Sequence, residues 1–249
     1  MGKIEKMRVN VIGYGTVGKA QAFLLRRLEH EVFVFDPYLF PAVKRLEKNV
    51  ELTFICTPEH AVDGVVQNLI REHVVGLYVV KSTVLVGTTE GLMKKFGVHV
   101  AHNPEFLREN YANDDVVNPD RIIIGQCCKD HAEKLVSIYA PMNKPIFVTD
   151  PTTSEAVKLL SNSYFATLIT FWNEANELAG KLGVDIHEVA ELVLADHRMA
   201  KYGTSKFGEP FEGKCLPANL DQLINAFHSS GLNPLLFEAI KKYNQRLSK

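Results

Sequence analysis

The fold is decided by residues 7–38, MRVNVIGYGTVGKAQAFLLRRLEHEVFVFDPY. A short run of valine and isoleucine leads into Gly13-x-Gly15-x-x-Gly18, an amphipathic helical stretch follows, and a second apolar run ends at Asp36. Strand, glycine turn, helix and strand in this order predict one βαβ unit. The three glycines allow a tight turn, close approach of a pyrophosphate and close packing of the helix on the strand.

This unit predicts binding of NAD. A helix that starts after the glycine turn offers unpaired N–H groups and a partial positive charge to phosphates. Asp36 ends the second strand, where a carboxylate accepts hydrogen bonds from the ribose hydroxyls of NAD and repels the 2′-phosphate of NADP. The alternative is a glycine turn without a ligand. The expected cofactor contacts in this segment are Gly13, Tyr14, Gly15, Thr16, Val17, Gly18 and Asp36.

Further strands are predicted at spacings that leave room for alternating helices, over residues 52–58, 75–83, 98–106 and 121–125. Ligands of such sheets bind beyond the carboxyl ends of the strands. The residues there are expected to face one crevice, although each taken singly could be a turn residue that caps a helix. They are Thr57, Pro58, Ser82, Thr83, Asn103 and Glu105. The fold class is therefore α/β, a doubly wound parallel sheet of the Rossmann type, over residues 1–150.

A second, all-helical domain is predicted over residues 151–249. Apolar residues recur at helical spacing for about thirty positions after residue 151, with Thr153 or Ser154 as the cap and Gly183 at the end. Lys158 and Asn162 lie four apart and so share one face of this helix, although spacing alone is more typical of solvated residues than of a site. A second helix is expected over residues 184–199 and a last helical run from Leu220, with a break at 230–231.

Composition excludes several classes of protein. Of the 249 residues, 46% are hydrophobic and 23% are charged, and the formal net charge is −1. The sequence has no basic block that would predict a nucleic-acid partner. Its apolar runs are all shorter than the ~20 residues that are needed to cross a membrane. The sequence begins without the apolar region of a signal peptide, so a cytoplasmic location is expected.

The four cysteines show no C-x-x-C pattern, so reduced thiols are expected, and no spacing of ligand residues predicts a metal. Cys56, Cys127 and Cys128 are expected to be apolar thiols in or beside strands, with no basic partner nearby in the sequence. For Cys215, residue type alone favours the same interpretation.

Seven motifs occur in one order: GYGTVG (13–18), CTP (56–58), KSTVLVGTT (81–89), NPEFLRE (103–109), EAVKLLSNSY (155–164), DHR (196–198) and GKCLP (213–217). In these motifs the sequence resembles the UDP-glucose/GDP-mannose 6-dehydrogenase family. NPEFLRE and the helix-borne K-x-x-x-N are the most specific of them. The resemblance covers nearly the whole chain.

The resemblance implies an enzyme that oxidises the C6 alcohol of a nucleotide sugar, or of a related hydroxyl compound, to a carboxylate. The family uses two NAD and a cysteine thioester. By this resemblance Cys215 is the nucleophile, Lys158 stabilises negative charge on the substrate oxygen, and Asn162 is its hydrogen-bonding partner in the site. Glu105 is the acid/base of thioester hydrolysis.

The same resemblance implies binding residues and a dimer. Beside the cofactor it places Cys56, Thr57, Pro58, Ser82, Thr83 and Glu109. At the substrate it places Phe106, Leu107, Arg198, Phe211 and Gly213, with Arg198 reaching the substrate of the neighbouring subunit. A homodimer is expected through the long helix from Ser154, whose apolar residues include Phe165, Ile169, Phe171 and Trp172.

Three departures from the family pattern bear on activity. Ala218 and Asn219 stand where the family has Lys-Asp, and an amide cannot replace the aspartate as a base. Residues 210–213 read Pro-Phe-Glu-Gly instead of Gly-aromatic-Gly-Gly, so a carboxylate, Glu212, enters the expected substrate loop. The sequence also ends about where the family's second nucleotide-binding-like domain is expected to begin.

Two other interpretations stay open. One is a catalytically impaired NAD-binding relative that acts as a binding or regulatory module, which the departures at 218 and 219 favour. The other is an enzyme similar to the β-hydroxyacid dehydrogenases, which also carry a helix-borne lysine and asparagine. That family, however, has no counterpart of Cys215 or of NPEFLRE.

Overall fold

The computed structural model describes residues 6–39, 46–205, 207–213 and 215–248. The chain divides into two compact units, Met1–Lys158 and Leu159–Lys249. Lys206 and Lys214, within the segment expected to be irregular, lie outside the described residues. The two units are described separately below.

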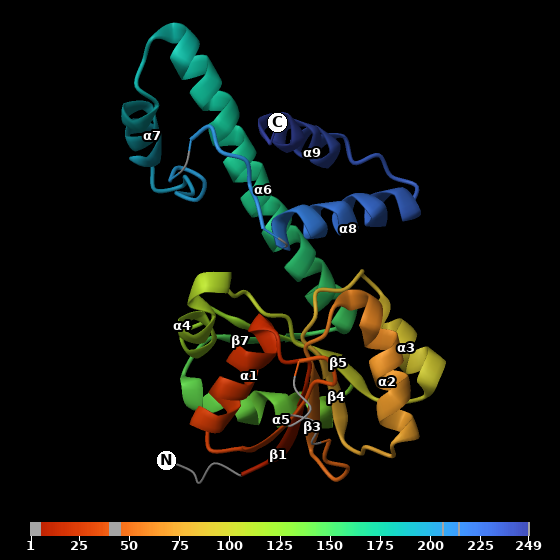
Figure 1. The fold of residues 1–249 in the computed structure, drawn as a ribbon. Helices are drawn as coiled ribbons and strands as arrows, with labels where there is room; N and C mark the ends of the chain where they lie inside the picture. The colour runs from red at the N-terminus through yellow and green to blue at the C-terminus, as the bar shows by residue number, and fades with distance from the viewer. Residues whose placement is uncertain (1–5, 40–45, 206, 214, 249) are drawn as a thin grey trace. The chain divides into compact units, whose positions relative to one another are not determined.

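The described residues of the first unit form one seven-stranded sheet in the order β2-β1-β3-β4-β5-β6-β7 (Figure 1). The strands are β1 (Arg8–Ile12), β2 (Glu31–Phe35), β3 (Leu52–Ile55), β4 (Leu77–Val80), β5 (Val100–His102), β6 (Ile122–Gly125) and β7 (Ile146–Thr149). Neighbouring strands run parallel except β5 and β6, which meet antiparallel with His102 opposite Gly125. The doubly wound α/β prediction is confirmed.

The sheet differs from the prediction at its far end. The sequence predicted parallel strands throughout, but antiparallel neighbours need no full crossover, and residues 103–121 return to the sheet after one short helix, α4 (Ala112–Val117). The edge strand β7 was not predicted. Its residues are half-buried or exposed, so it lacks the continuous buried run by which the other strands were found.

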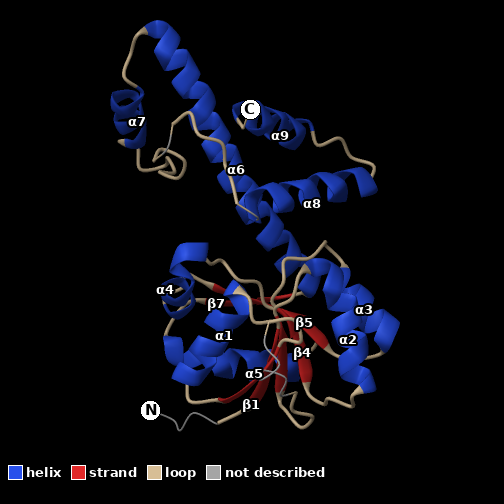
Figure 2. Ribbon diagram, in the orientation of Figure 1, coloured by secondary structure: helices blue, strands red, loops and turns tan. Residues whose placement is uncertain are grey.

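Helices cover both faces of the sheet (Figure 2). On one face pack α1 (Thr16–Arg27), α4 and α5 (Lys129–Tyr139); on the other pack α2 (Val62–Arg71) and α3 (Thr88–Phe96). Strand β4 shows the alternation that this requires, because Leu77 and Val79 belong to the first core and Tyr78 and Val80 to the second. The sheet is therefore buried on both faces, as parallel sheets are.

The second unit contains the rest of the long helix α6 (Pro151–Leu182), then α7 (Ile186–Leu194), α8 (Cys215–Ser229) and α9 (Leu235–Leu247). One core joins α6, α8 and α9 through Ala166, Leu220 and Ile240. Another joins α6 and α7 through Trp172 and Ala190. The helical prediction is confirmed.

Several helix boundaries differ from the prediction. Asp150, rather than Thr153 or Ser154, caps α6, because its carboxylate accepts hydrogen bonds from the amide (2.8 Å) and the hydroxyl (2.6 Å) of Thr153. Helix α7 starts later than expected, since Asp185 caps it through the His187 amide, and it ends at Leu194 rather than at residue 199. Helix α8 begins at Cys215, before the predicted Leu220. Gly183, at φ +70°, ends α6 as predicted.

Within the part of the chain that the structure describes, no helix combines the length and the apolar character that crossing a membrane requires.

The junction of β1 and α1 depends on the absence of a side chain at Gly18. A Cβ atom there would lie 1.9 Å from the Gly13 carbonyl oxygen. We expect Gly18→Ala to lower the free energy of unfolding by about 3 kcal/mol, the upper end for an overpacked site. Urea denaturation followed by circular dichroism measures the change.

Gly91 is the matched control, because it also lies inside a helix but a Cβ there meets nothing within 4 Å. Gly91→Ala should raise the free energy of unfolding by up to about 1 kcal/mol through helix propensity. Equal effects of the two substitutions would contradict the steric account.

Candidate functional site

The glycine turn after β1 has room for a phosphate. Gly13 adopts φ +85°, and a Cβ there would lie 2.8 Å from the Cys56 carbonyl oxygen. Around Gly15, in contrast, a Cβ would meet nothing within 4 Å. Gly15 is also the N-cap of α1, and no side chain caps this helix. The first amides of α1 therefore have no side-chain acceptor and can bind an anion.

Asp36 holds the glycine turn against the end of β2. Its carboxylate is buried and accepts hydrogen bonds from the amides of Tyr14 (2.7 Å), Tyr38 (3.0 Å) and Leu39 (3.3 Å). A carboxylate has about four acceptor positions, so capacity remains for a ribose hydroxyl. The sequence predicted that this acid follows the second strand, as it does, but not its three amide partners.

The ends of β3 and β4 meet beside the glycine turn. Ser82 Oγ donates to the Thr57 carbonyl oxygen (2.6 Å), which joins the two strand ends. Thr57 Oγ1 is buried and has no hydrogen-bond partner in the structure. A buried hydroxyl without a partner costs free energy, so a bound ligand at this position would satisfy it.

The other residues expected beside the cofactor are placed as follows. Cys56 packs into the first core, and burial raises the pKa of its thiol to about 12, which makes it unreactive. Pro58 is exposed and Thr83 half-buried, each just beyond its strand. Glu109 is exposed in a short 3₁₀ helix, η3 (Glu109–Tyr111). The open glycine turn, the uncapped helix and the Thr57 hydroxyl together fit a dinucleotide.

Glu105 and Lys158 form a buried ion pair in the first unit. Lys158 Nζ lies 3.1 Å from Glu105 Oε1, and the two side chains are only 4% and 11% exposed. The second carboxylate oxygen of Glu105 accepts from the Leu107 amide (2.6 Å). The Phe106 ring lies beside this pair, with its centroid 5.2 Å from Lys158 Nζ. Four of the predicted site residues thus come together from segments about fifty positions apart.

A buried polar network supports this pair and was not predicted. Asn103 accepts from Lys81 Nζ (3.1 Å) and from the Tyr139 hydroxyl (2.6 Å), and donates to the Ile123 carbonyl (2.7 Å). Burial lowers the pKa of Lys81 to about 8. Asn103 therefore forms its side-chain hydrogen bonds inside the unit. The sequence assigned it to the crevice because a polar residue at the end of a strand is typical both of a ligand site and of a structural contact.

In the second unit, Asn162 and Asn219 are both buried, and Asn162 Nδ2 donates to Asn219 Oδ1. Asn219 in turn donates to Gln222 Oε1 (2.9 Å). Cys215 is exposed in the first turn of α8, one turn before Asn219. The position at which the sequence departs from the family pattern therefore touches a predicted catalytic residue.

Three further residues of the second unit were predicted to bind substrate, and the structure places them as follows. Phe211 is buried in the core, and its backbone exchanges two hydrogen bonds with the Asn244 side chain (2.8 and 3.0 Å). Arg198 is exposed and paired with Asp196. Gly213 adopts φ +81°, and a Cβ there would meet nothing within 4 Å. In this structure the Phe211 ring therefore packs in the core of the second unit.

Residues 42–143 match the NAD-binding domain of the UDP-glucose/GDP-mannose dehydrogenase family, and residues 152–246 match its central domain. The UDP-glucose 6-dehydrogenase of Rickettsia typhi is 30% identical over 96% of this chain and 67% of its own length. The chain belongs to the UDP-glucose/GDP-mannose dehydrogenase family. Its match to the family's NAD-binding domain identifies the dinucleotide as NAD.

Two further relatives show what share of a family member's length this chain covers. The UDP-glucose 6-dehydrogenase of Rickettsia conorii is 35% identical, and the match covers 75% of this chain but only 44% of the relative. The UDP-glucose dehydrogenase of Pyrobaculum islandicum has a similar structure, with a TM-score of 0.88 and 29% identity over 99% of this chain and 69% of that one. The chain thus corresponds to part of the length of these relatives.

The buried ion pair makes a prediction about stability. Replacing one partner leaves a buried charge, so Lys158→Met should lower the free energy of unfolding by about 3–5 kcal/mol. Adding Glu105→Leu removes the stranded carboxylate and should recover most of that loss. Chemical denaturation of both variants measures the two changes.

The exposed pair of Lys95 and Asp63, 2.7 Å apart with side chains 57% and 51% exposed, is the control. Lys95→Met should cost about 1 kcal/mol or less. A Lys158→Met cost no larger than that would show that Lys158 and Glu105 are solvated in solution.

Proposed function

We propose that this chain is an NAD-dependent nucleotide-sugar 6-dehydrogenase that oxidises an alcohol to a carboxylate through a thioester on Cys215. The observation that carries the proposal is the buried pair of Lys158 and Glu105. These residues match the family's catalytic lysine and acid, and family membership supports their roles. The first unit would hold NAD through the amides of α1, the Asp36 carboxylate and the Thr57 hydroxyl. NAD, when bound, accepts one hydride in each of two oxidations.

The proposed route has three stages. The alcohol loses a hydride and its hydroxyl proton and becomes an aldehyde. The Cys215 thiolate adds to the aldehyde carbon, and the carbonyl electron pair moves to oxygen; loss of a second hydride then gives a thioester. Water adds to the thioester carbon, the C–S bond breaks, and the products are a carboxylate and the Cys215 thiol. The first turn of α8 favours a negatively charged sulfur.

Lys158 and Glu105 have complementary roles in this route. An ammonium group stabilises the oxygen anion that forms when sulfur or water adds to the carbonyl carbon. Glu105 would take the proton from the attacking water. Lys81 is a second buried amine in the same unit and is electrostatically coupled to Glu105 and Lys158. Two buried amines near one carboxylate favour the formation of negative charge on the substrate oxygen.

Asn219 favours the second candidate, an impaired relative that binds NAD without completing the oxidation. The resemblance expects an aspartate here to activate the cysteine, whereas the Asn219 amide is already bonded to Asn162 and Gln222. An amide does not accept a proton at neutral pH. We expect any turnover by the natural chain to be slow for this reason.

We further propose a homodimer through α6, because one face of this helix in the second unit is exposed and apolar. Its members are Leu160, Tyr164, Phe171, Leu178 and Leu182, each between 49% and 66% exposed. Spacings of four and seven residues place all five on one stripe. Trp172, expected to be exposed, is instead buried in the core with α7, and Phe165 and Ile169 are half-buried. A long apolar stripe in water is typical of an interface.

The activity test measures NADH formation with UDP-glucose and then with GDP-mannose. We expect slow turnover, a loss on the order of a thousandfold or more in Cys215→Ser, and a gain of about tenfold or more in Ala218→Lys/Asn219→Asp. Mass spectrometry should find a substrate adduct on Cys215. NAD titration calorimetry on the same samples separates the candidates, because heat of binding without turnover or adduct in any variant would favour the impaired relative.

The dimer test is sedimentation equilibrium of the full chain. We expect a dimer for the natural sequence and a monomer for Phe171→Glu, since a buried unpaired carboxylate is costly. Val75→Glu, at an apolar residue of similar exposure in the first unit, is the control and should stay dimeric. A monomeric natural chain would exclude the α6 interface.

A further inference from the structure

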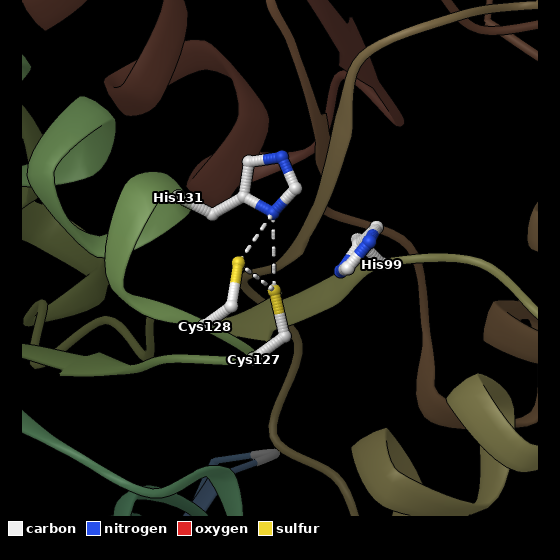
Figure 3. A group of neighbouring side chains, drawn as sticks. All are labelled: His99, Cys127, Cys128 and His131. Carbon is white, nitrogen blue, oxygen red and sulfur yellow. Dashed lines mark hydrogen bonds between the residues drawn. The ribbon is translucent and has the colours of Figure 1, made fainter.

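Four side chains of metal-ligating types lie together in the first unit. They are His99, Cys127, Cys128 and His131, and one ligand atom of each lies within 4.8 Å of those of the other three (Figure 3). His131 Nδ1 is 3.3 Å from Cys127 Sγ and 3.2 Å from Cys128 Sγ, and the two sulfurs are 3.9 Å apart. His99 faces this group with its ring centroid 4.7 Å from that of His131.

The antiparallel pairing of β5 with β6 explains how these residues meet. His102 lies opposite Gly125, so the residues just before β5 and the residues just after β6 lie at the same edge of the sheet. Cys128 is also the N-cap of α5, and His131 follows in the first turn of that helix. Two parallel strands would not have brought the start of one to the end of the other.

This arrangement corrects one expectation from the sequence and bears on a second. Cys127 and Cys128 were expected to have no basic partner, but both contact the His131 imidazole. No metal was expected from the spacing of ligand residues, because the fourth residue of the group, His99, lies just before β5, 28 positions before Cys127 in the chain. Spacing rules find ligands within one segment and miss those that strand pairing supplies.

We propose that His99, Cys127, Cys128 and His131 bind a zinc-type metal ion in a closed, structural site. Two sulfurs and two imidazole nitrogens are a ligand set typical of zinc. Bond lengths of about 2.3 Å to sulfur and 2.0–2.1 Å to nitrogen place tetrahedral ligands about 3.4–3.8 Å apart. The separations of 3.2–3.9 Å among three of the four ligand atoms in the structure are already close to these values.

The chemistry of the site balances in charge and protons. Binding exchanges the two thiol protons for M²⁺, so two thiolates neutralise the ion and two protons pass to water. The sulfur separation of 3.9 Å is far from the ~2.05 Å of a disulfide, and all four cysteines of the chain are thiols. His99 is exposed, which gives an ion a path into the cluster.

The position of the site points to a structural role. Ligands of parallel sheets bind beyond the carboxyl ends of the strands, where the glycine turn and Thr57 lie. His99 instead precedes β5, at the amino end of that strand. A bound ion would join the start of β5 to the end of β6 and the first turn of α5, where the sheet has its one antiparallel bridge within the described strands.

Cobalt(II) is the probe, because tetrahedral thiolate coordination gives intense visible d–d bands and a near-ultraviolet charge-transfer band. The full chain, purified with a reductant and a chelator and then freed of both, should bind one cobalt per chain with these bands, and zinc should displace it. Cys127→Ser/Cys128→Ser should lose the charge-transfer band. Cys215→Ser, at an exposed thiol elsewhere in the chain, should keep it.

His99→Gln is a second variant that is expected to fold, because His99 is the exposed member of the cluster. It should fold normally by circular dichroism and bind cobalt on the order of a hundredfold more weakly, since one of four ligands supplies about a quarter of the binding free energy of a structural zinc site. His60→Gln, at another exposed histidine of the first unit, should bind like the natural chain.

Four results would overturn the proposal. The first three are cobalt bands that survive in Cys127→Ser/Cys128→Ser, octahedral spectra without a charge-transfer band in the natural chain, and unchanged cobalt affinity in His99→Gln. Formation of a Cys127–Cys128 disulfide on mild oxidation, with no metal binding by the reduced chain, would show a redox pair instead. None of these measurements depends on dehydrogenase activity, so the site and the proposed function can fail separately.

Discussion

The first two turns of α6 carry three buried polar residues, and the first unit depends on satisfying them. Ser154 bonds to His102 (2.8 Å), whose other ring nitrogen donates to the Ser82 carbonyl (3.3 Å). Glu155 accepts from the Gly87 and Thr89 amides and from the Thr89 hydroxyl. Lys158 pairs with Glu105. Because an unpaired buried polar group costs about 1–3 kcal/mol, these contacts fix where α3, β4 and β5 meet the helix.

This constraint links the fold to the proposed chemistry. Burial lowers the pKa of His102 to about 3, so the imidazole stays neutral and acts as a spacer between Ser154 and Ser82. At Gly125 a Cβ would lie 2.7 Å from Ser154 Cβ, so the strand that carries the antiparallel pairing also approaches α6 closely. The ion pair, the strand ends and the reversed pairing are thus parts of one buried polar arrangement.

The sequence predicted what depends on local pattern. Periodicity and the glycine turn gave the doubly wound sheet and the helical second half, and the family motifs identified Glu105 and Lys158 before their contact was visible. It missed what depends on pairing between distant segments: the edge strand β7, the direction of β6, the partners of Asn103 and the gathering of His99 with Cys127, Cys128 and His131. Register is a property of two segments at once, so neither segment alone reveals it.

Helix α6 begins inside the first unit and continues into the second, and this has a practical consequence for dissecting the protein. A fragment that ends at Asp150, just after the last strand, would leave His102, Thr89 and Glu105 without their hydrogen-bonding and ionic partners on α6. An expression fragment meant to isolate the cofactor-binding part must therefore retain the helix at least through Lys158, the last residue of the first unit.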